Sequence, residues 1–94
     1  MWWLGKKKRR ERRVQKLLER DGRQCWLCAR PIIAGEETIE HLKAKAAGGT
    51  NDLENLVLCH SGCNVHLKDR PVARKFRMRV KWHRETARWA RAEP

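Results

Sequence analysis

A carboxylate and an imidazole stand side by side at Glu40 and His41, and two amides follow at Asn55 and Asn64. Histidine titrates near neutral pH, so it can take a proton from an attacking water molecule. Carboxylate and amide oxygens are the ligands that hard divalent ions such as Mg²⁺ prefer. Taken singly, Glu-His is usually an ordinary exposed pair and Asn55 a turn residue. Together these residues gather an acid, a base and two amides into one short segment.

The chain has four cysteines, which form two short pairs: Cys25 with Cys28, and Cys59 with Cys63. Two pairs that flank a turn-rich insert of 30 residues are typical of a structural Zn²⁺ held by four thiolates at about 2.3 Å. His60 and His66 are possible substitutes for a thiolate, although four thiols already complete the shell. Three residues separate the second pair, where two is the commoner number. Unrelated buried cysteines and disulfides are the alternatives.

The formal charge of +12 and the pI of about 10.5 favour a polyanionic partner, either nucleic acid or an anionic membrane surface. Residues 1–20 hold nine Lys/Arg against two Glu, and residues 65–94 hold ten against three acidic residues, so each segment carries +7. Residues 21–64 carry −2. Two basic segments therefore flank a slightly acidic centre, and such a centre suits a cation site.

No stretch has the pattern of a targeting or membrane segment. Residues 1–5 are too short for the apolar region of a signal peptide, and no run approaches the ~18 apolar residues of a membrane span. We expect a cytoplasmic protein, because thiols stay reduced there and paired cysteines more often bind metal. A role at a membrane surface is the weaker alternative, since the apolar stripes of the last segment suffice only for packing.

Apolar periodicity indicates the elements that would position the candidate residues. The expected elements are a mobile basic arm over 1–10, a helix over 11–20, a strand over 38–42, a loop over 43–55, a strand over 56–58, a short helix over 64–69 and a helix over 72–92. Gly22 should end the first helix in a left-handed conformation. The first strand should place Glu40 and His41 on opposite faces.

The last expected helix carries two apolar stripes. One consists of Val72, Phe76, Val80 and Ala87, and the other of Met78, Trp82 and Trp89. Because Lys and Arg separate the stripes, we expect both to be packing surfaces.

The region from about residue 13 to residue 71 resembles the HNH nuclease family. The resemblance lies in an acid-histidine pair, a Gly-Gly loop, an asparagine and a Cys…Cys-Asn knuckle: Glu40-His41, Gly48-Gly49, Asn55, and Leu58-Cys59 with Cys63-Asn64. It implies a small α+β fold with a ββα-metal core stapled by zinc and flanked by N- and C-terminal helices. The implied divisions are the basic N-terminal arm 1–10, a nuclease core 11–71 and a basic C-terminal helix 72–94 packed on that core.

The same resemblance implies roles for the candidate residues. His41 would be the general base, and Asn55 would brace the loop that orients it. Glu40 and Asn64 would hold a catalytic Mg²⁺ or Mn²⁺. The family usually has Asp before the histidine; Glu40 is one methylene longer, so the ion could shift by ~1 Å, with weaker activity or a preference for Mn²⁺. Asn64 stands in place of a histidine and favours a hard ion over a second zinc. His66 is a competing ligand.

These roles describe a metal-dependent DNA endonuclease of the kind that bacteria and their phages encode. The rival interpretation is a non-catalytic zinc-ribbon module that binds DNA. The sequence is compatible with a chain that acts alone, as a dimer, or within a phage packaging or restriction machine. The basic residues expected to contact DNA are Lys6, Lys7, Lys8, Arg9, Arg10, Lys43, Lys45, Arg74, Arg77 and Lys81.

Overall fold

The described part of the chain opens with a long helix, α1, that runs from Trp2 to Asp21. The computed structural model describes residues 2–92. The expected mobile arm over 1–10 is corrected here: its described residues are the first half of α1, because lysine and arginine are good helix formers. The end of the helix is as expected. Gly22 has φ 77° and donates its N–H to the Leu18 carbonyl at 2.8 Å.

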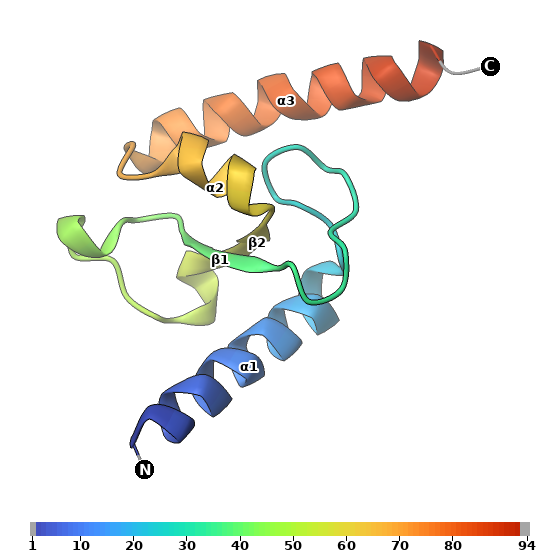
Figure 1. Cartoon of the computed structure of the whole chain (residues 1–94). Helices are drawn as coiled ribbons and strands as arrows, with labels where there is room; N and C mark the ends of the chain where they lie inside the picture. Colours follow the sequence, from blue (N-terminus) through green and yellow to red (C-terminus); the bar gives the residue numbers. More distant parts are fainter. Residues whose placement is uncertain (1, 93–94) are drawn as a thin grey trace.

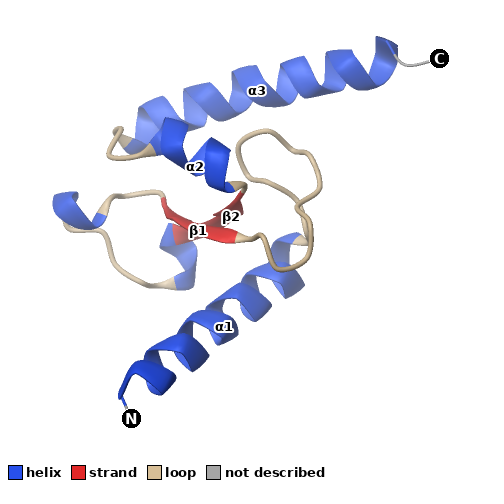
Figure 2. Ribbon diagram, viewed as in Figure 1, coloured by secondary structure: helices blue, strands red, loops and turns tan. Residues whose placement is uncertain are grey.

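A two-stranded antiparallel hairpin lies at the centre of the molecule (Figure 2). Strand β1 spans Thr38–His41 and strand β2 spans Leu56–Cys59. The register opposes Glu40 to Val57 and His41 to Leu56. Both strands were expected at these positions, and the β-branched and aliphatic residues explain them. The hairpin therefore presents His41 at the point where β1 enters the connecting loop.

The loop between the strands is folded into two short 3₁₀ turns, η1 (Lys45–Ala47) and η2 (Leu53–Asn55). Its Gly-Gly pair has a steric reason. Gly48 adopts φ 90°, and a Cβ at Gly49 would overlap the carbonyl oxygen of Lys43. Only glycine fits both positions, so the pair brings the loop back toward β1.

Two helices follow β2. Helix α2 spans Ser61–Leu67 and packs against β1, and helix α3 spans Val72–Ala92. The bounds of α3 match the expected helix over 72–92, whereas α2 begins three residues before the expected start at Asn64. None of the helices within residues 2–92 is long and apolar enough to cross a membrane.

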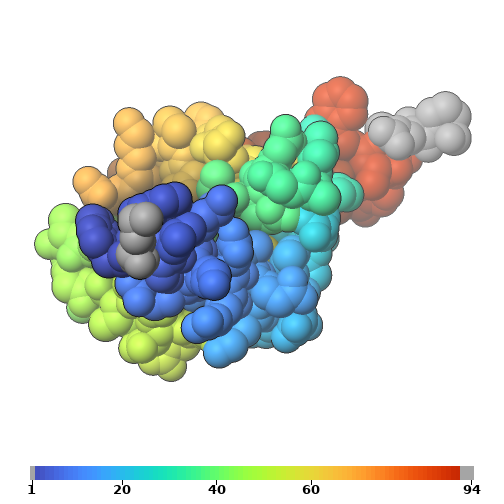
Figure 3. Space-filling model, turned by 60° about the horizontal axis from the view of Figure 1, so that its bottom comes forward, coloured from blue at the N-terminus to red at the C-terminus, as the bar shows by residue number. Residues whose placement is uncertain are grey.

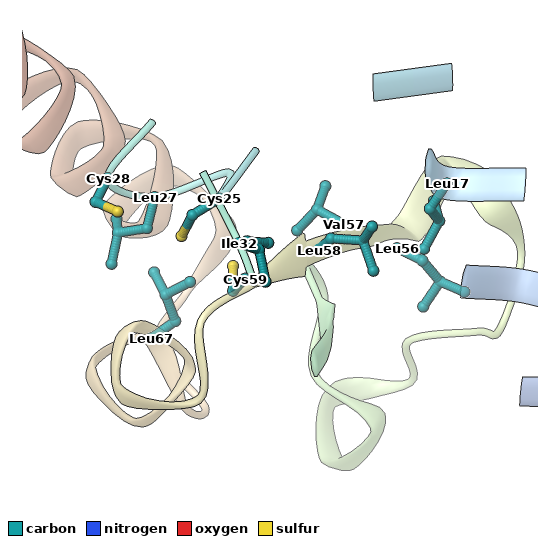
Figure 4. Close-up of a cluster of buried hydrophobic side chains, with 10 residues drawn as sticks. All are labelled: Leu17, Cys25, Leu27, Cys28, Ile32, Leu56, Val57, Leu58, Cys59 and Leu67. Atoms are coloured by element: carbon teal, nitrogen blue, oxygen red, sulfur yellow. The ribbon is translucent and has the colours of Figure 1, made fainter. Parts of the chain in front are cut away.

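The helices α1 and α3 lie on opposite sides of the hairpin (Figure 1). The buried core between them consists of Leu17 from α1 and nine residues of β2, α2 and the segment over 25–32, which is called the knuckle from here on: Cys25, Leu27, Cys28, Ile32, Leu56, Val57, Leu58, Cys59 and Leu67 (Figure 4). Such a small core supplies little stability by itself, so a metal staple is physically reasonable. The α+β class expected from the sequence is confirmed, with β1, β2 and α2 as its ββα unit.

One of the two apolar stripes of α3 is not a packing surface. Val80 is 57% exposed, and Val72 and Phe76 are also exposed, although Phe76 meets the Trp26 ring edge-on. The other stripe packs against the core through Met78 and Trp82, while its last member, Trp89, is exposed. The core is too small to cover two stripes of a helix this long, so the expectation that both would pack was wrong.

Candidate metal centre and active site

Three thiols and one imidazole gather at the start of α2. The ligand atoms of Cys25, Cys28, His60 and Cys63 all lie within 4.8 Å of one another. The Nδ1 atom of His60 lies 3.4 Å from the Cys28 sulfur and 3.7 Å from the Cys63 sulfur. Ligands around a tetrahedral Zn²⁺ are roughly 3.5–3.8 Å apart. The geometry and the soft donor set fit one zinc ion.

The ligands come from two local structures with compatible geometry. Cys25 and Cys28 lie in a tight turn that the Ala29 N–H closes by donating to the Cys25 carbonyl at 2.9 Å. His60 is the N-cap residue of α2 and Cys63 is the third residue of that helix, so their side chains meet over the first turn. His60 donates its Nε2–H to the Pro31 carbonyl at 2.9 Å, which leaves Nδ1 unprotonated and aimed at the thiols.

Cys59 lies outside this ligand group, and His60 takes the place that the sequence analysis gave to Cys59. Cys59 is the last residue of β2, and its side chain is buried in the core beside Cys25 (Figure 4). The Cys59 thiol hydrogen-bonds to Cys25 and lowers the pKa of Cys25 to about 3, while the same contact raises the pKa of Cys59. The signal was present in the sequence: His60 and Cys63 have the usual two-residue spacing.

On the α1 side of the hairpin, His41 lies at the rim of a hollow of about 380 Å³. Its Nε2–H donates to the side-chain oxygen of Asn51 at 2.9 Å, so Nδ1 is the nitrogen free to accept a proton. Asn51 was not among the residues predicted for the site, and nothing in the local sequence pattern marks it as the partner of His41. Only the folded loop brings it there.

The same hollow is lined by the basic face of α1. The residues around His41 and Asn51 are Lys6, Arg9, Arg10, Arg13, Ile39, Lys45 and Leu56. Figure 3 shows α1, in blue, lying beside the yellow-green loop that follows β1. Arg13 was not among the residues expected to bind DNA. Five cationic side chains thus surround one imidazole, and this concentration of positive charge suits a phosphate group.

Asn55 braces the loop as the sequence analysis expected. Its amide donates to the carbonyls of Lys43 and Thr50, at 3.1 and 2.9 Å, and its oxygen accepts the Lys43 N–H at 2.8 Å. Asn55 itself makes no side-chain hydrogen bond to His41 within the described residues. It fixes the backbone on both sides of the Gly-Gly pair, and the side chain that holds His41 is Asn51.

Glu40 and Asn64 lie on the other face of β1, toward α2 and α3. Glu40 is only 5% exposed, and its Oε2 is buried without a hydrogen-bond partner among the described residues. Burial raises the pKa of this carboxyl group, and Lys75 opposes the rise. The Asn64 amide donates to the Thr38 hydroxyl and the Ile39 carbonyl, at 3.2 Å each, which leaves its oxygen available. A buried oxygen without a partner and a free amide oxygen fit a hard divalent ion.

Lys75, which comes from α3, was not among the site residues predicted from the sequence. Its side chain is fully buried, its Nζ donates to the His41 carbonyl at 2.7 Å, and it lies 3.7 Å from Glu40 Oε2. Lysine is rarely buried this way, because the ammonium must be paired and hydrogen-bonded. No motif identified Lys75, since it is one of many basic residues on a basic helix.

The remaining candidates occupy other places. Lys7, Lys8 and Lys43 are exposed but do not line the hollow at His41, and neither do Arg74, Arg77 and Lys81, which lie on exposed positions of α3. His66, the competing ligand, stacks edge-on against Trp82 with ring centroids 5.1 Å apart. It is outside the zinc ligand group.

Comparison with known protein families supports the resemblance seen in the sequence. Residues 25–70 match the family model described as HNH endonuclease, a segment that includes the knuckle, both strands and α2. Neither the curated proteins nor the solved structures gave a match.

Proposed function

Because residues 25–70 make this chain a member of the HNH endonuclease family, we propose that it is a metal-dependent DNA endonuclease with His41 as the general base. The observation that carries the proposal is the hollow beside β1. There, an imidazole with a free Nδ1 is held by Asn51 and surrounded by cations of α1. A base amid fixed positive charge is the arrangement that hydrolysis of a phosphodiester needs.

The proton transfer can be assigned to one atom. Nε2–H of His41 donates to Asn51, so Nδ1 takes the proton from the attacking water. Because the hydrogen bond already holds the ring in this orientation, the reaction does not have to bear the entropic cost of stopping its rotation. Asn51 is therefore a positioning residue, and Asn55 holds the loop from which Asn51 extends.

The DNA backbone would lie along α1 and reach the end of β1. Arg9, Arg10 and Arg13 would pair with phosphate oxygens, and arginine suits this role because its planar fork can donate twice. Glu40 and His41 face opposite sides of β1. The scissile phosphate would therefore lie at the His41 end of β1, where both side chains could reach it. Lys45 is on the loop side of the same hollow.

A divalent ion held by Glu40 and Asn64 would neutralise negative charge that develops on the phosphate and the leaving oxygen. The Zn²⁺ of the knuckle would have a structural role instead, because four protein ligands leave no open position for a substrate. Mg²⁺ and Mn²⁺ are both candidates for the first site. A location in the cytoplasm of a bacterial cell or phage-infected host remains part of the proposal.

Plasmid nicking tests the proposal. Zinc-loaded protein is freed of other divalent ions by gel filtration, since a strong chelator would also remove the zinc, and Mg²⁺ or Mn²⁺ is then added back. We expect nicking only with the added ion, and a 10²–10⁴-fold lower rate for His41→Ala. His66→Ala removes an imidazole outside the hollow and should retain the parental rate. Equal rates for parent and His41→Ala would refute the base assignment.

One observation favours a second candidate, a zinc module that binds DNA without cutting it. The ammonium of Lys75 already stands beside Glu40, where the ion is needed. A gel-shift experiment with a labelled DNA duplex distinguishes the two candidates. The non-cutting module would shift the duplex and leave it intact in Mg²⁺ and in Mn²⁺, whereas the endonuclease would cleave it.

A further inference from the structure

The side chain of Lys75 extends from α3 to strand β1. Lys75 lies outside the segment that matches the family model, residues 25–70. It is the one buried lysine of the described chain. Its Nζ contacts two consecutive residues of β1, the carbonyl oxygen of His41 at 2.7 Å and the carboxylate of Glu40 at 3.7 Å. The positive charge therefore lies beside the only carboxylate in the proposed ion site.

The side chain cannot easily leave this position, because α3 is anchored along the same face. Arg79 and His83 donate to the Trp26 carbonyl, at 2.9 and 2.8 Å, and the Thr86 hydroxyl donates to the Cys28 carbonyl at 2.6 Å. Together with Lys75 these residues recur at helical spacing on one side of α3. The zinc knuckle thus holds the helix that carries Lys75.

We propose that Lys75 is the resident counter-ion of Glu40 and that its fixed charge sets how tightly the site binds a divalent ion. The inference rests on the proposed metal site. Without the ion, the ammonium compensates a carboxylate that would otherwise be buried and unpaired. With the ion, two positive groups share one carboxylate in a poorly solvated place, and their repulsion lowers the affinity. Such a site binds the ion weakly and depends on the DNA phosphate to complete it.

The test measures Mn²⁺ binding to zinc-loaded protein without DNA, by titration calorimetry and by the Mn²⁺ electron paramagnetic resonance signal. It is run at about pH 8, well above the ordinary carboxyl pKa of about 4.3. Lys75→Gln keeps an N–H donor for the His41 carbonyl and removes the charge. We expect it to bind Mn²⁺ at least about tenfold more tightly than the parent, because repulsion between charges a few ångströms apart is large even when screened.

Two variants serve as controls. Arg84→Gln removes one charge from an exposed position of the same helix and should leave the Mn²⁺ affinity unchanged. Glu40→Gln should abolish Mn²⁺ binding in both backgrounds, which identifies the site. Unchanged or weaker binding by zinc-loaded, folded Lys75→Gln would overturn the proposal. If parent and Lys75→Gln both bind no Mn²⁺, this inference and the proposed ion site both fail. If the parent binds and the variants are equal, only the inference fails.

A measurement on the unaltered chain covers the case in which Lys75→Gln does not fold. The side-chain NMR signal of the buried lysine should move when Mg²⁺ is added, with the same midpoint as a calorimetric titration of the unaltered chain with Mg²⁺, because its neighbour Glu40 changes partners. A lysine signal that stays in place at saturating Mg²⁺ would show that Lys75 and the ion do not share Glu40.

Discussion

Helices α1 and α3 are similar in composition and differ in how they use their charge. They have 20 and 21 residues, both are strongly basic, and they lie on opposite sides of the hairpin (Figure 1). The buried residue of α1 is Leu17, near its end, and four cations nearer its start, Lys6, Arg9, Arg10 and Arg13, line the hollow at His41. In α3 the contact face carries polar side chains beside Met78 and Trp82, and these polar side chains include the buried Lys75.

This difference teaches that the number of basic residues on a helix does not reveal their role. The α1 cations that line the hollow are exposed, or half-buried in the case of Arg13, and accessible to a phosphate, although Arg10 also donates to the Glu37 carbonyl at 3.1 Å. A cation on the inner face of α3 is already paired with protein carbonyls or a carboxylate, as Lys75 and Arg79 are. We therefore expect α1 to govern DNA affinity and α3 to govern the integrity of the two metal sites.

The largest effect should come from removing the zinc on which α3 depends. His60→Ala or Cys63→Ser should unfold the domain, because zinc binding to small domains is worth about 10–16 kcal/mol. Cys59→Ala should retain one zinc per chain and lose only about 1 kcal/mol of stability. Elemental analysis and thermal melts distinguish the two ligand sets: loss of zinc from Cys59→Ala would restore Cys59 as a ligand.

A smaller effect is expected on the α1 side of the hairpin, at Asn51. Asn51→Ala removes the acceptor that orients His41, and the turnover should fall about 10–100-fold with little change in DNA affinity. Asn51→Asp keeps an acceptor oxygen and should recover most of the rate. Single-turnover cleavage at saturating DNA measures both. If Asn51→Ala lowered the DNA affinity as much as the cleavage rate, Asn51 would contact the DNA substrate instead of orienting His41.

The two helices can be compared directly by charge reversal. Arg9→Glu with Arg13→Glu should weaken DNA binding by roughly tenfold or more and make the slope of log K against log salt shallower by about 2, at about 0.9 for each phosphate contact. Arg74→Glu with Arg77→Glu on α3 should have a clearly smaller effect, although both residues were expected from the sequence to contact DNA. If fluorescence anisotropy showed the same loss of DNA affinity for the α1 and α3 variants, DNA would contact both helices.

The smallest effect concerns the outer stripe of α3. Val80→Lys should change the free energy of unfolding by less than about 0.5 kcal/mol, because Val80 is 57% exposed. Met78→Ala, which removes a half-buried side chain from the packed stripe, should cost roughly 1–2 kcal/mol. Urea denaturation measures both. A stability loss for Val80→Lys that matches Met78→Ala would indicate that the outer stripe is covered in solution.

Much of the architecture follows from local patterns. The two strands, the bounds of α3 and the left-handed Gly22 were all predicted, since alternation, helical periodicity and glycine at a helix end are properties of short segments. The predicted start of the first helix was wrong, because the run of cations before residue 11 was taken for a flexible arm although lysine and arginine favour a helix. Three of the four zinc ligands were predicted. The fourth ligand, His60 instead of Cys59, became clear only when the structure placed His60 at the N-cap of α2, beside Cys63.

The sequence by itself determined the chemistry available to this protein: a base and an acid side by side, asparagines in the loop and after it, paired cysteines and two basic segments. Only the tertiary structure decided which of these groups meet. Asn51 reaches His41 across the folded loop, Arg9 and Arg13 of α1 line the same hollow as His41, and Lys75 reaches Glu40 from α3. The reason is physical: spacing along the chain fixes contacts within one turn or strand, whereas contacts between elements depend on which faces the core buries.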